Sequence, residues 1–166
     1  MAPSILIVDD DPMSRDIIRV ICERLGYAVD VAEDGFAGLT RLRDGRYRAA
    51  LVDYHLPEMD GYALARLMHD LDGDLRLIGV TADRHGLSAR CVSNALFEAI
   101  VAKPVSPEAL AGVLAAVVPT RKETSPGARL RKPDTQRARE MAELLWRKHG
   151  LGVATDYLSA IGMDAI

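Results

Sequence analysis

The chain has 166 residues, of which 49% are hydrophobic and 27% are charged, and its formal net charge is −3. This composition is typical of a globular protein and argues against disordered and fibrous classes, and the slightly acidic balance gives no general signal for nucleic-acid binding. No apolar run approaches the roughly 20 residues of a membrane-spanning helix, and the run at 5–8 is too short for a secretory signal, so we expect a cytoplasmic protein that does not bind membranes.

The first predicted unit is a strand followed by a helix. Residues 5–8 form a continuous apolar run, which is typical of a strand covered on both faces. Asp11 and Pro12 then have the properties of a helix N-cap and a first helical residue, and Gly26 ends the helix. The residues expected on its apolar face are Ile17, Ile18, Ile21, Cys22 and Leu25.

Four further units repeat this alternation up to residue 118. Strands are predicted at 28–32, 49–53, 75–81 and 99–102, and helices at 35–43, 61–71, 87–96 and from Ser106-Pro107-Glu108 onward. Alternation of this kind predicts a doubly wound α/β fold, with a parallel sheet between two layers of helices. Right-handed crossovers restrict its topology to a few forms.

The rest of the chain divides into a linker at 119–132 and a helical hairpin at 133–166. The linker is rich in proline, glycine and basic residues. The apolar residues of the two predicted helices are Ala138, Met141, Ala142, Leu145 and Trp146, then Ala154, Tyr157, Leu158 and Ile161. The hairpin is too small for a core of its own, so we expect it to pack on the α/β domain of residues 1–118, on a partner or on a second copy. We favour a homodimer, because two-fold dimers commonly hide such a face.

Polar residues follow four of the predicted strands: Asp9-Asp10, Asp53, Thr81 and Lys103. In an open α/β sheet, ligands bind at this carboxyl edge. Each feature is common by itself, but the convergence of four separate segments is not. Carboxylates about 4 Å apart repel each other by roughly 1 kcal/mol per pair in bulk water and by more near a protein surface. A hard cation such as Mg²⁺ relieves this repulsion.

The same residue types suit phosphoryl transfer. With a metal ion offsetting charge, one carboxylate can attack phosphorus and form an aspartyl phosphate. A hydroxyl and an ammonium group would then hold the remaining phosphoryl oxygens. Thr81 and Lys103 supply these two groups.

Four sequence blocks resemble the receiver domain of two-component response regulators. They are VDDDP at 8–12, LVDYHLPEMDG at 51–61, GVTA at 79–82 and AKPVS at 102–106. The resemblance covers about residues 4–118 and implies a flavodoxin-like, five-stranded sheet in the order 2-1-3-4-5. It also implies that the phosphoryl group comes from a sensor histidine kinase or a histidine phosphotransfer protein.

Roles for individual residues follow from the same resemblance. Asp53 would be the phosphoacceptor, Thr81 would bond a phosphoryl oxygen, and Lys103 would pair with the phosphoryl group. The implied Mg²⁺ ligands are Asp9, Asp10, Asp53 and the His55 backbone carbonyl. The family usually has a cis proline after the lysine, here Pro104. Such a domain is not an enzyme for other substrates, since it catalyses only its own phosphorylation and dephosphorylation.

Asp11 and Ile100 are two further positions of interest near the predicted site. Asp11 continues the acidic pair, but its role as helix N-cap is favoured over metal ligation. Ile100 stands where the family usually has Tyr or Phe, an aromatic residue that swings inward on activation. Isoleucine cannot act as such a ring, so phosphoacceptance is better supported by the sequence than the usual way of passing the signal on.

Two other classes of function remain as alternatives. A haloacid-dehalogenase-like phosphatase also uses an aspartate after its first strand, but Met13 stands where that family has Thr or Val. A Rossmann domain is disfavoured because no glycine-rich turn follows the first strand. The hairpin could also belong to a transcriptional regulator with a partial DNA-binding output, although no recognition helix follows its two helices. Nucleic-acid binding therefore stays open.

Overall fold

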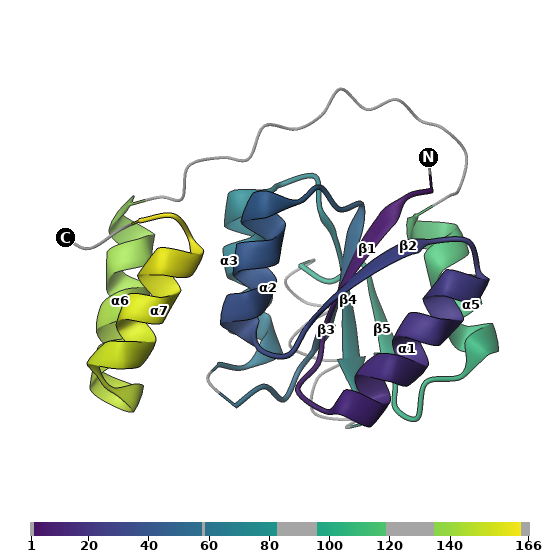
Figure 1. Cartoon of the computed structure of the whole chain (residues 1–166), viewed down its shortest axis with the longest axis horizontal. Coiled ribbons are helices and arrows are strands. Elements are labelled where there is room, and N and C mark those ends of the chain that lie inside the picture. The colour runs from purple at the N-terminus through teal and green to yellow at the C-terminus, as the bar shows by residue number, and fades with distance from the viewer. Residues whose placement is uncertain (1, 58, 83–95, 119–134, 164–166) are drawn as a thin grey trace.

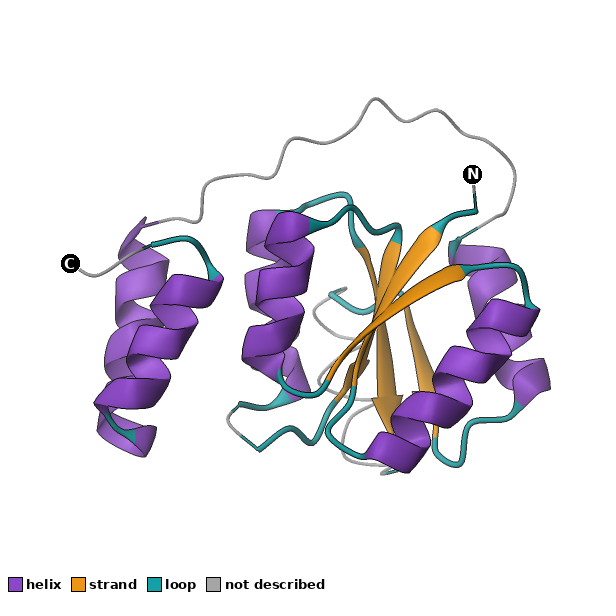
Figure 2. Cartoon of the chain, in the orientation of Figure 1, coloured by secondary structure: helices purple, strands orange, loops and turns teal. Residues whose placement is uncertain are grey.

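A five-stranded parallel sheet forms the centre of the computed structural model, which describes residues 2–57, 59–82, 96–118 and 135–163 (Figures 1 and 2). The strands are β1 (Ser4–Val8), β2 (Ala28–Ala32), β3 (Ala49–Asp53), β4 (Arg76–Thr81) and β5 (Ala99–Ala102). Their order is β2-β1-β3-β4-β5. This order confirms the predicted doubly wound topology.

The described helices cover both faces of the sheet and continue into the C-terminal hairpin (Figure 1). They are α1 (Pro12–Arg24), α2 (Gly35–Asp44), α3 (Gly61–Leu71), α5 (Pro107–Val117), α6 (Thr135–His149) and α7 (Leu151–Ala160). Helices α1 and α5 lie on one face, and α2 and α3 lie on the other. The helix predicted at 87–96 lies outside the described residues except for its last position, and the whole linker at 119–132 lies outside them.

Side-chain caps explain where several helices begin. Asp11 accepts hydrogen bonds from the backbone amides of Met13 and Ser14, which confirms it as the N-cap of α1. Ser106 caps α5 in the same way, through the amide of Ala109. After α1, Gly26 has a φ of +96°, a conformation that side chains with a Cβ rarely adopt.

The two sides of the sheet bury separate apolar clusters. Alternate residues of β1 point to opposite sides, as the strand geometry requires, so that Leu6 and Val8 pack under α2 and α3 while Ile5 and Ile7 pack under α1 and α5. These four side chains are no more than 1% exposed. Burial on both sides explains the continuous apolar run in the sequence.

The apolar face of α1 is narrower than predicted. Ile18, Ile21 and Cys22 are buried, whereas Ile17 is 48% exposed and Leu25 is 36% exposed. Ile17 is one residue from Ile18, which is about 100° around the helix axis, so it points away from the sheet. Leu25 is the C-cap, at the end of the helix.

The hairpin packs on the α/β domain of its own chain. Tyr157 of α7 makes an edge-on ring contact with Phe36 of α2, with ring centroids 6.4 Å apart. Arg43 of α2 donates a hydrogen bond of 2.8 Å to the Ser159 carbonyl, near the C-terminal end of α7. The buried residues of the hairpin extend the apolar cluster under α2 and α3 to the outer side of these helices (Figure 1). They are Ala138, Ala142, Leu145, Ala154, Tyr157, Ala160 and Ile161.

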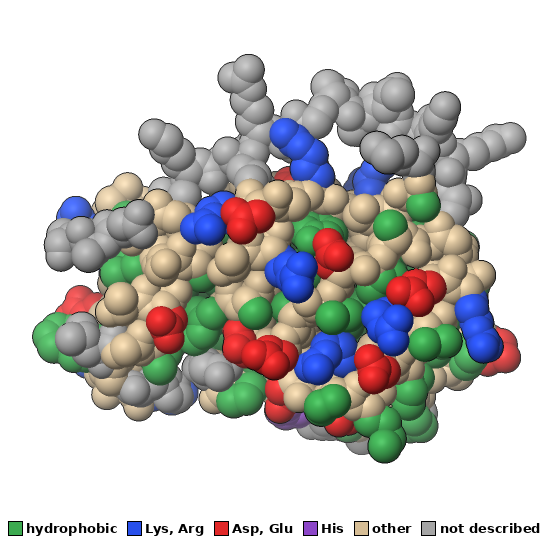
Figure 3. All heavy atoms as spheres, in the orientation of Figure 1, with side chains coloured by type: hydrophobic (Ala, Val, Ile, Leu, Met, Phe, Trp, Pro, Cys, Tyr) green, Lys and Arg blue, Asp and Glu red, His purple; other side chains and the backbone are tan. Residues whose placement is uncertain are grey.

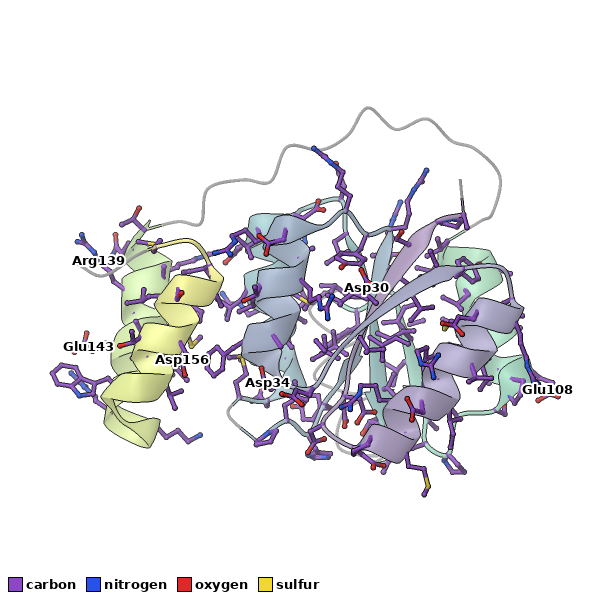
Figure 4. The ribbon with its side chains drawn as sticks, in the orientation of Figure 1. Asp30, Asp34, Glu108, Arg139, Glu143 and Asp156 are labelled. Atoms are coloured by element: carbon purple, nitrogen blue, oxygen red, sulfur yellow. The ribbon has the colours of Figure 1, made fainter. Side chains whose placement is uncertain are left out.

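One residue of the predicted hairpin stripe is placed differently. Trp146 was predicted on the buried face, but it is 58% exposed. It follows the buried Leu145 by one residue and is therefore turned about 100° away. Figure 4 shows Arg139 and Glu143 on the side of α6 that faces away from α2. The rest of the stripe that we expected a second copy to cover packs against the α/β domain of the same chain, and dimerisation stays a prediction.

Two further observations concern the distribution of surface charge and the capacity of the helices to span a membrane. In the view of Figure 3, basic and acidic side chains are interspersed, and neither sign forms a continuous patch on that face. Within the described ranges, no helix has both the length and the apolar character that crossing a membrane requires.

Candidate functional site

The predicted site residues lie together at the carboxyl edge of the sheet. Asp9 follows β1, Asp53 ends β3, Thr81 ends β4 and Lys103 follows β5. Strand register aligns these ends, since Val8 pairs with Val52, Asp53 with Val80, and Thr81 with Ala102. The parallel sheet thus joins four segments that are distant in the sequence.

Three carboxylates form the acidic part of the site. One oxygen from each of Asp9, Asp10 and Asp53 lies within 4.8 Å of the others. Asp9 is 1% exposed and Asp53 is 5% exposed, whereas Asp10 is exposed to solvent. Two of the three negative charges are therefore shielded from water. Their mutual repulsion is stronger in the protein interior than it would be in water.

Lys103 neutralises part of this charge. Its Nζ lies 3.0 Å from Asp9 Oδ2 and 3.0 Å from Asp53 Oδ2, so one ammonium group bridges the two buried carboxylates. The Lys103–Pro104 peptide bond is cis, as the resemblance implied. A buried charge that lost this bridge would be strongly destabilising.

The pKa values of the bridged groups reflect competing effects. Burial raises the pKa of Asp53, the hydrogen bond and charge of Lys103 lower it, and the charge of Asp9 raises it, with a net increase. Burial alone would lower the pKa of Lys103, but its hydrogen bonds and ion pairs with Asp9 and Asp53 outweigh this effect and raise the pKa. Lys103 is therefore held as a cation, and a further cation in the site would favour the ionised form of Asp53.

The Asp9 carboxylate is held by the first turn of α1. Asp9 Oδ1 accepts a hydrogen bond of 2.9 Å from the Asp11 amide, and Asp9 Oδ2 accepts one of 2.8 Å from Ser14 Oγ. Arg15 Nη1 donates to the Asp9 carbonyl at 2.9 Å. Neither Ser14 nor Arg15 belongs to the polar residues predicted for the site. The available signal was their position in the first helical turn after the acidic pair.

The loop after Asp53 folds closely against it. The His55 amide donates to Asp53 Oδ1 at 3.2 Å, and His55 forms an isolated antiparallel bridge with Asp60. A Cβ on Gly61 would lie 2.6 Å from the Asp53 carbonyl oxygen, so only glycine fits there. His55 is thus beside the acceptor, while metal binding by its carbonyl stays a prediction.

Thr81 and Ile100 occupy the neighbouring strands. Thr81 is 2% exposed, and its carbonyl accepts a hydrogen bond of 2.8 Å from the Lys103 amide. Ile100 of β5 is half-buried and packs against the cluster under α2 and α3. The structure therefore brings Thr81 next to Lys103 and places an aliphatic side chain where the family usually has an aromatic one.

The donor set fits Mg²⁺. This ion prefers hard oxygen ligands, and it commonly takes one or two carboxylates together with water and phosphate oxygens. The exposed Asp10 borders solvent, and the buried Asp9 and Asp53 provide fixed carboxylates beside it. No nitrogen or sulfur ligand belongs to this group of described residues.

Comparisons with known proteins agree with this geometry. The model of the response regulator receiver domain family matches residues 5–115. The sensor histidine kinase RcsC of Salmonella typhi is 34% identical over 112 residues, which are 67% of this chain and 12% of RcsC. The sensor protein EvgS of Escherichia coli K12 is 36% identical over 80 residues, which are 48% of this chain and 7% of EvgS. The chain thus spans about a tenth of the length of these curated relatives.

Solved structures show the same fold. A CheY-like receiver domain from Methanospirillum hungatei JF-1 superposes with a TM-score of 0.65 at 32% identity, over 70% of this chain and 93% of that one. The receiver domain of the sensor histidine kinase PA1611 from Pseudomonas aeruginosa PAO1 has a TM-score of 0.64 at 28% identity, over 70% of this chain and 98% of that one. That crystal structure has a magnesium ion coordinated in its active site cleft.

Together, the doubly wound sheet and the carboxylates and lysine at its carboxyl edge define a signalling domain of the CheY-like class. The chain belongs to the response regulator receiver domain family, and so to two-component signal transduction.

Proposed function

We propose that the chain is a phosphoacceptor in which Asp53 receives a phosphoryl group from a sensor histidine kinase or a histidine phosphotransfer protein, with Mg²⁺ held by Asp9, Asp10 and Asp53. The observation that carries this proposal is the bridge from Lys103 Nζ to both buried carboxylates, at 3.0 Å each. A cation at this place offsets the charge of an acceptor that must approach an anionic donor. The receiver-domain relatives within sensor kinases support the class of donor.

In the proposed transfer, an ionised oxygen of Asp53 attacks the phosphorus of a phosphohistidine. The new P–O bond forms as the P–N bond breaks, and the imidazole nitrogen keeps the electron pair and takes up a proton. When bound, Mg²⁺ supplies positive charge that offsets the carboxylates and the phosphoryl oxygens. Lys103 pairs with one phosphoryl oxygen, and the Thr81 hydroxyl donates a hydrogen bond to another.

The proposal also limits the chemistry of the domain. Hydrolysis of the aspartyl phosphate by water returns Asp53 to its starting form, and we assign no other substrate to the site. A cytoplasmic location belongs to the same proposal, because a histidine kinase draws its phosphoryl group from ATP.

Labelling with a small phosphodonor tests the acceptor. With Mg²⁺ and acetyl phosphate, the intact mass of the full chain should increase by one phosphoryl group that hydroxylamine removes. Asp53→Asn should abolish the increase. Asp11→Asn, which changes a carboxylate that caps α1, should retain it. A modification that persists in Asp53→Asn refutes the acceptor assignment, and one that maps to Asp9 supports the phosphatase alternative.

A further inference from the structure

Ser14 is the side chain of α1 that contacts the buried carboxylate of Asp9. Its Oγ donates a hydrogen bond of 2.8 Å to Asp9 Oδ2, the same oxygen that Lys103 Nζ contacts at 3.0 Å. The Asp11 amide holds Oδ1 at 2.9 Å. A carboxylate has about four acceptor positions, so these three donors fix its orientation and leave room for a further ligand.

The local fold keeps Ser14 in this place. Its backbone amide donates to Asp11 Oδ2 at 3.3 Å, as part of the N-cap of α1. The next residue, Arg15, donates to the Asp9 carbonyl. Contacts on both sides of Ser14 thus tie the first turn of α1 to the end of β1, and the hydroxyl is presented to Asp9 by a rigid element.

We propose that Ser14 is a positioning residue, which holds the Asp9 carboxylate in the orientation required for Mg²⁺ binding. This inference rests on the proposed function and extends it. In that function, Lys103 turns to a phosphoryl oxygen and its contact with Asp9 Oδ2 is lost. Ser14 and the Asp11 amide hold the carboxylate both before and after that change, so the hydroxyl should also affect Mg²⁺ binding by the unphosphorylated chain.

A merely structural role makes a different prediction. Alanine has a higher helix propensity than serine, so Ser14→Ala does not weaken α1 through propensity. Loss of the hydrogen bond to a buried carboxylate can lower the stability of the metal-free fold whether or not Ser14 affects metal binding. The affinity for Mg²⁺ separates the two roles, because substitutions of residues that orient metal ligands typically weaken metal affinity by 10- to 100-fold.

The test is a calorimetric titration of the full chain with MgCl₂. Ser14→Ala should raise the dissociation constant about tenfold. Ser14→Thr keeps the hydroxyl and should bind Mg²⁺ with a dissociation constant close to that of the wild type. Thr40→Ala removes a hydroxyl from a half-buried position of α2 and should leave the dissociation constant unchanged. Far-UV circular dichroism verifies that each variant is folded.

The outcomes are distinct. If Ser14→Ala binds Mg²⁺ as tightly as the wild type, the positioning role is refuted, even if its melting temperature falls. An equal loss of affinity in Ser14→Thr also refutes it, because the hydroxyl would then not be the group that matters. If the wild type itself gives no binding signal with MgCl₂, the proposed function fails first, and the inference fails with it.

Discussion

The contact between Phe36 and Tyr157 provides a direct test of how the hairpin is placed. These rings join α2 of the receiver to α7 of the hairpin, with centroids 6.4 Å apart and planes inclined at 63°. We consider Phe36→Ala, Tyr157→Ala and the double variant. If the hairpin packs on its own receiver as described, the two single substitutions should interact energetically although they are far apart in the sequence.

The expected magnitudes follow from burial. Tyr157 is 1% exposed, and truncation of a fully buried aromatic residue to alanine costs about 3–5 kcal/mol. The ring contact itself should appear as a coupling energy of about 0.5–1.5 kcal/mol in the double-mutant cycle. A second contact across the same interface should be weaker. Arg137 and Asp70 are 3.0 Å apart, but their side chains are 55% and 26% exposed, so their coupling should not exceed about 1 kcal/mol.

The assay is urea denaturation of the wild type, the two single variants and the double variant. Circular dichroism follows the transition and yields the free energy of unfolding. Parallel measurements on Arg137→Ala, Asp70→Ala and their double variant supply the matched comparison. If Tyr157→Ala changes the free energy of unfolding by less than about 0.5 kcal/mol, the value typical of surface substitutions, then the hairpin does not pack on α2. A coupling energy of zero with a large single effect would mean that Tyr157 is buried elsewhere.

Three further predictions concern the site and the hairpin. Lys103→Met should lower the free energy of unfolding by about 3 kcal/mol in a urea titration, because Asp9 and Asp53 lose their shared cation. MgCl₂ should recover part of this loss in stability. No recovery would contradict the metal site. Asp53→Asn should stabilise the fold at neutral pH. Because burial raises the pKa of Asp53 in the folded state above its unfolded-state value, the ionised form is disfavoured in the fold. The gain should decrease as the pH falls below the folded-state pKa and vanish below the unfolded-state pKa, and a gain that is independent of pH would contradict this reasoning. Truncation after Val118 should preserve phosphorylation of Asp53. Analytical ultracentrifugation of the full and truncated chains tests the predicted homodimer, and this prediction is wrong if the full chain sediments as a monomer at all concentrations.

Most of the fold could be predicted because its signals are local. The strand at 49–53 and the helix at 61–71 were predicted with the bounds that the structure has. Parallel strands also place their carboxyl ends at one edge, so the convergence of Asp9, Asp53 and Lys103 followed from the alternation of strands and helices alone. In natural sequences, local preferences for helix or strand typically agree with the global topology.

Other features depend on the direction of individual side chains and on which surface packs against an element. The spacing of apolar residues in the sequence does not specify either of these. Ser14 contacts Asp9 only because the cap of α1 turns its hydroxyl toward the end of β1. Trp146 differs from the buried Leu145 by one position and lies outside the covered stripe. An amphipathic hairpin shows that a face must be buried, but the surface that covers it, here α2, is decided by complementary groups such as Phe36 and Arg43.

Ile100 and the hairpin lie on the same side of the sheet. Ile100 packs against the apolar cluster that also includes Phe97 and Tyr157, whereas Val101, its neighbour in β5, belongs to the cluster on the opposite side. An isoleucine has no polar ring tip that could exchange a buried place for an exposed one. A change at this position must therefore act through packing, and close-packed interiors transmit small displacements rather than absorbing them. The same cluster includes the buried residues of the hairpin, so Ile100 and the hairpin pack against one continuous apolar core.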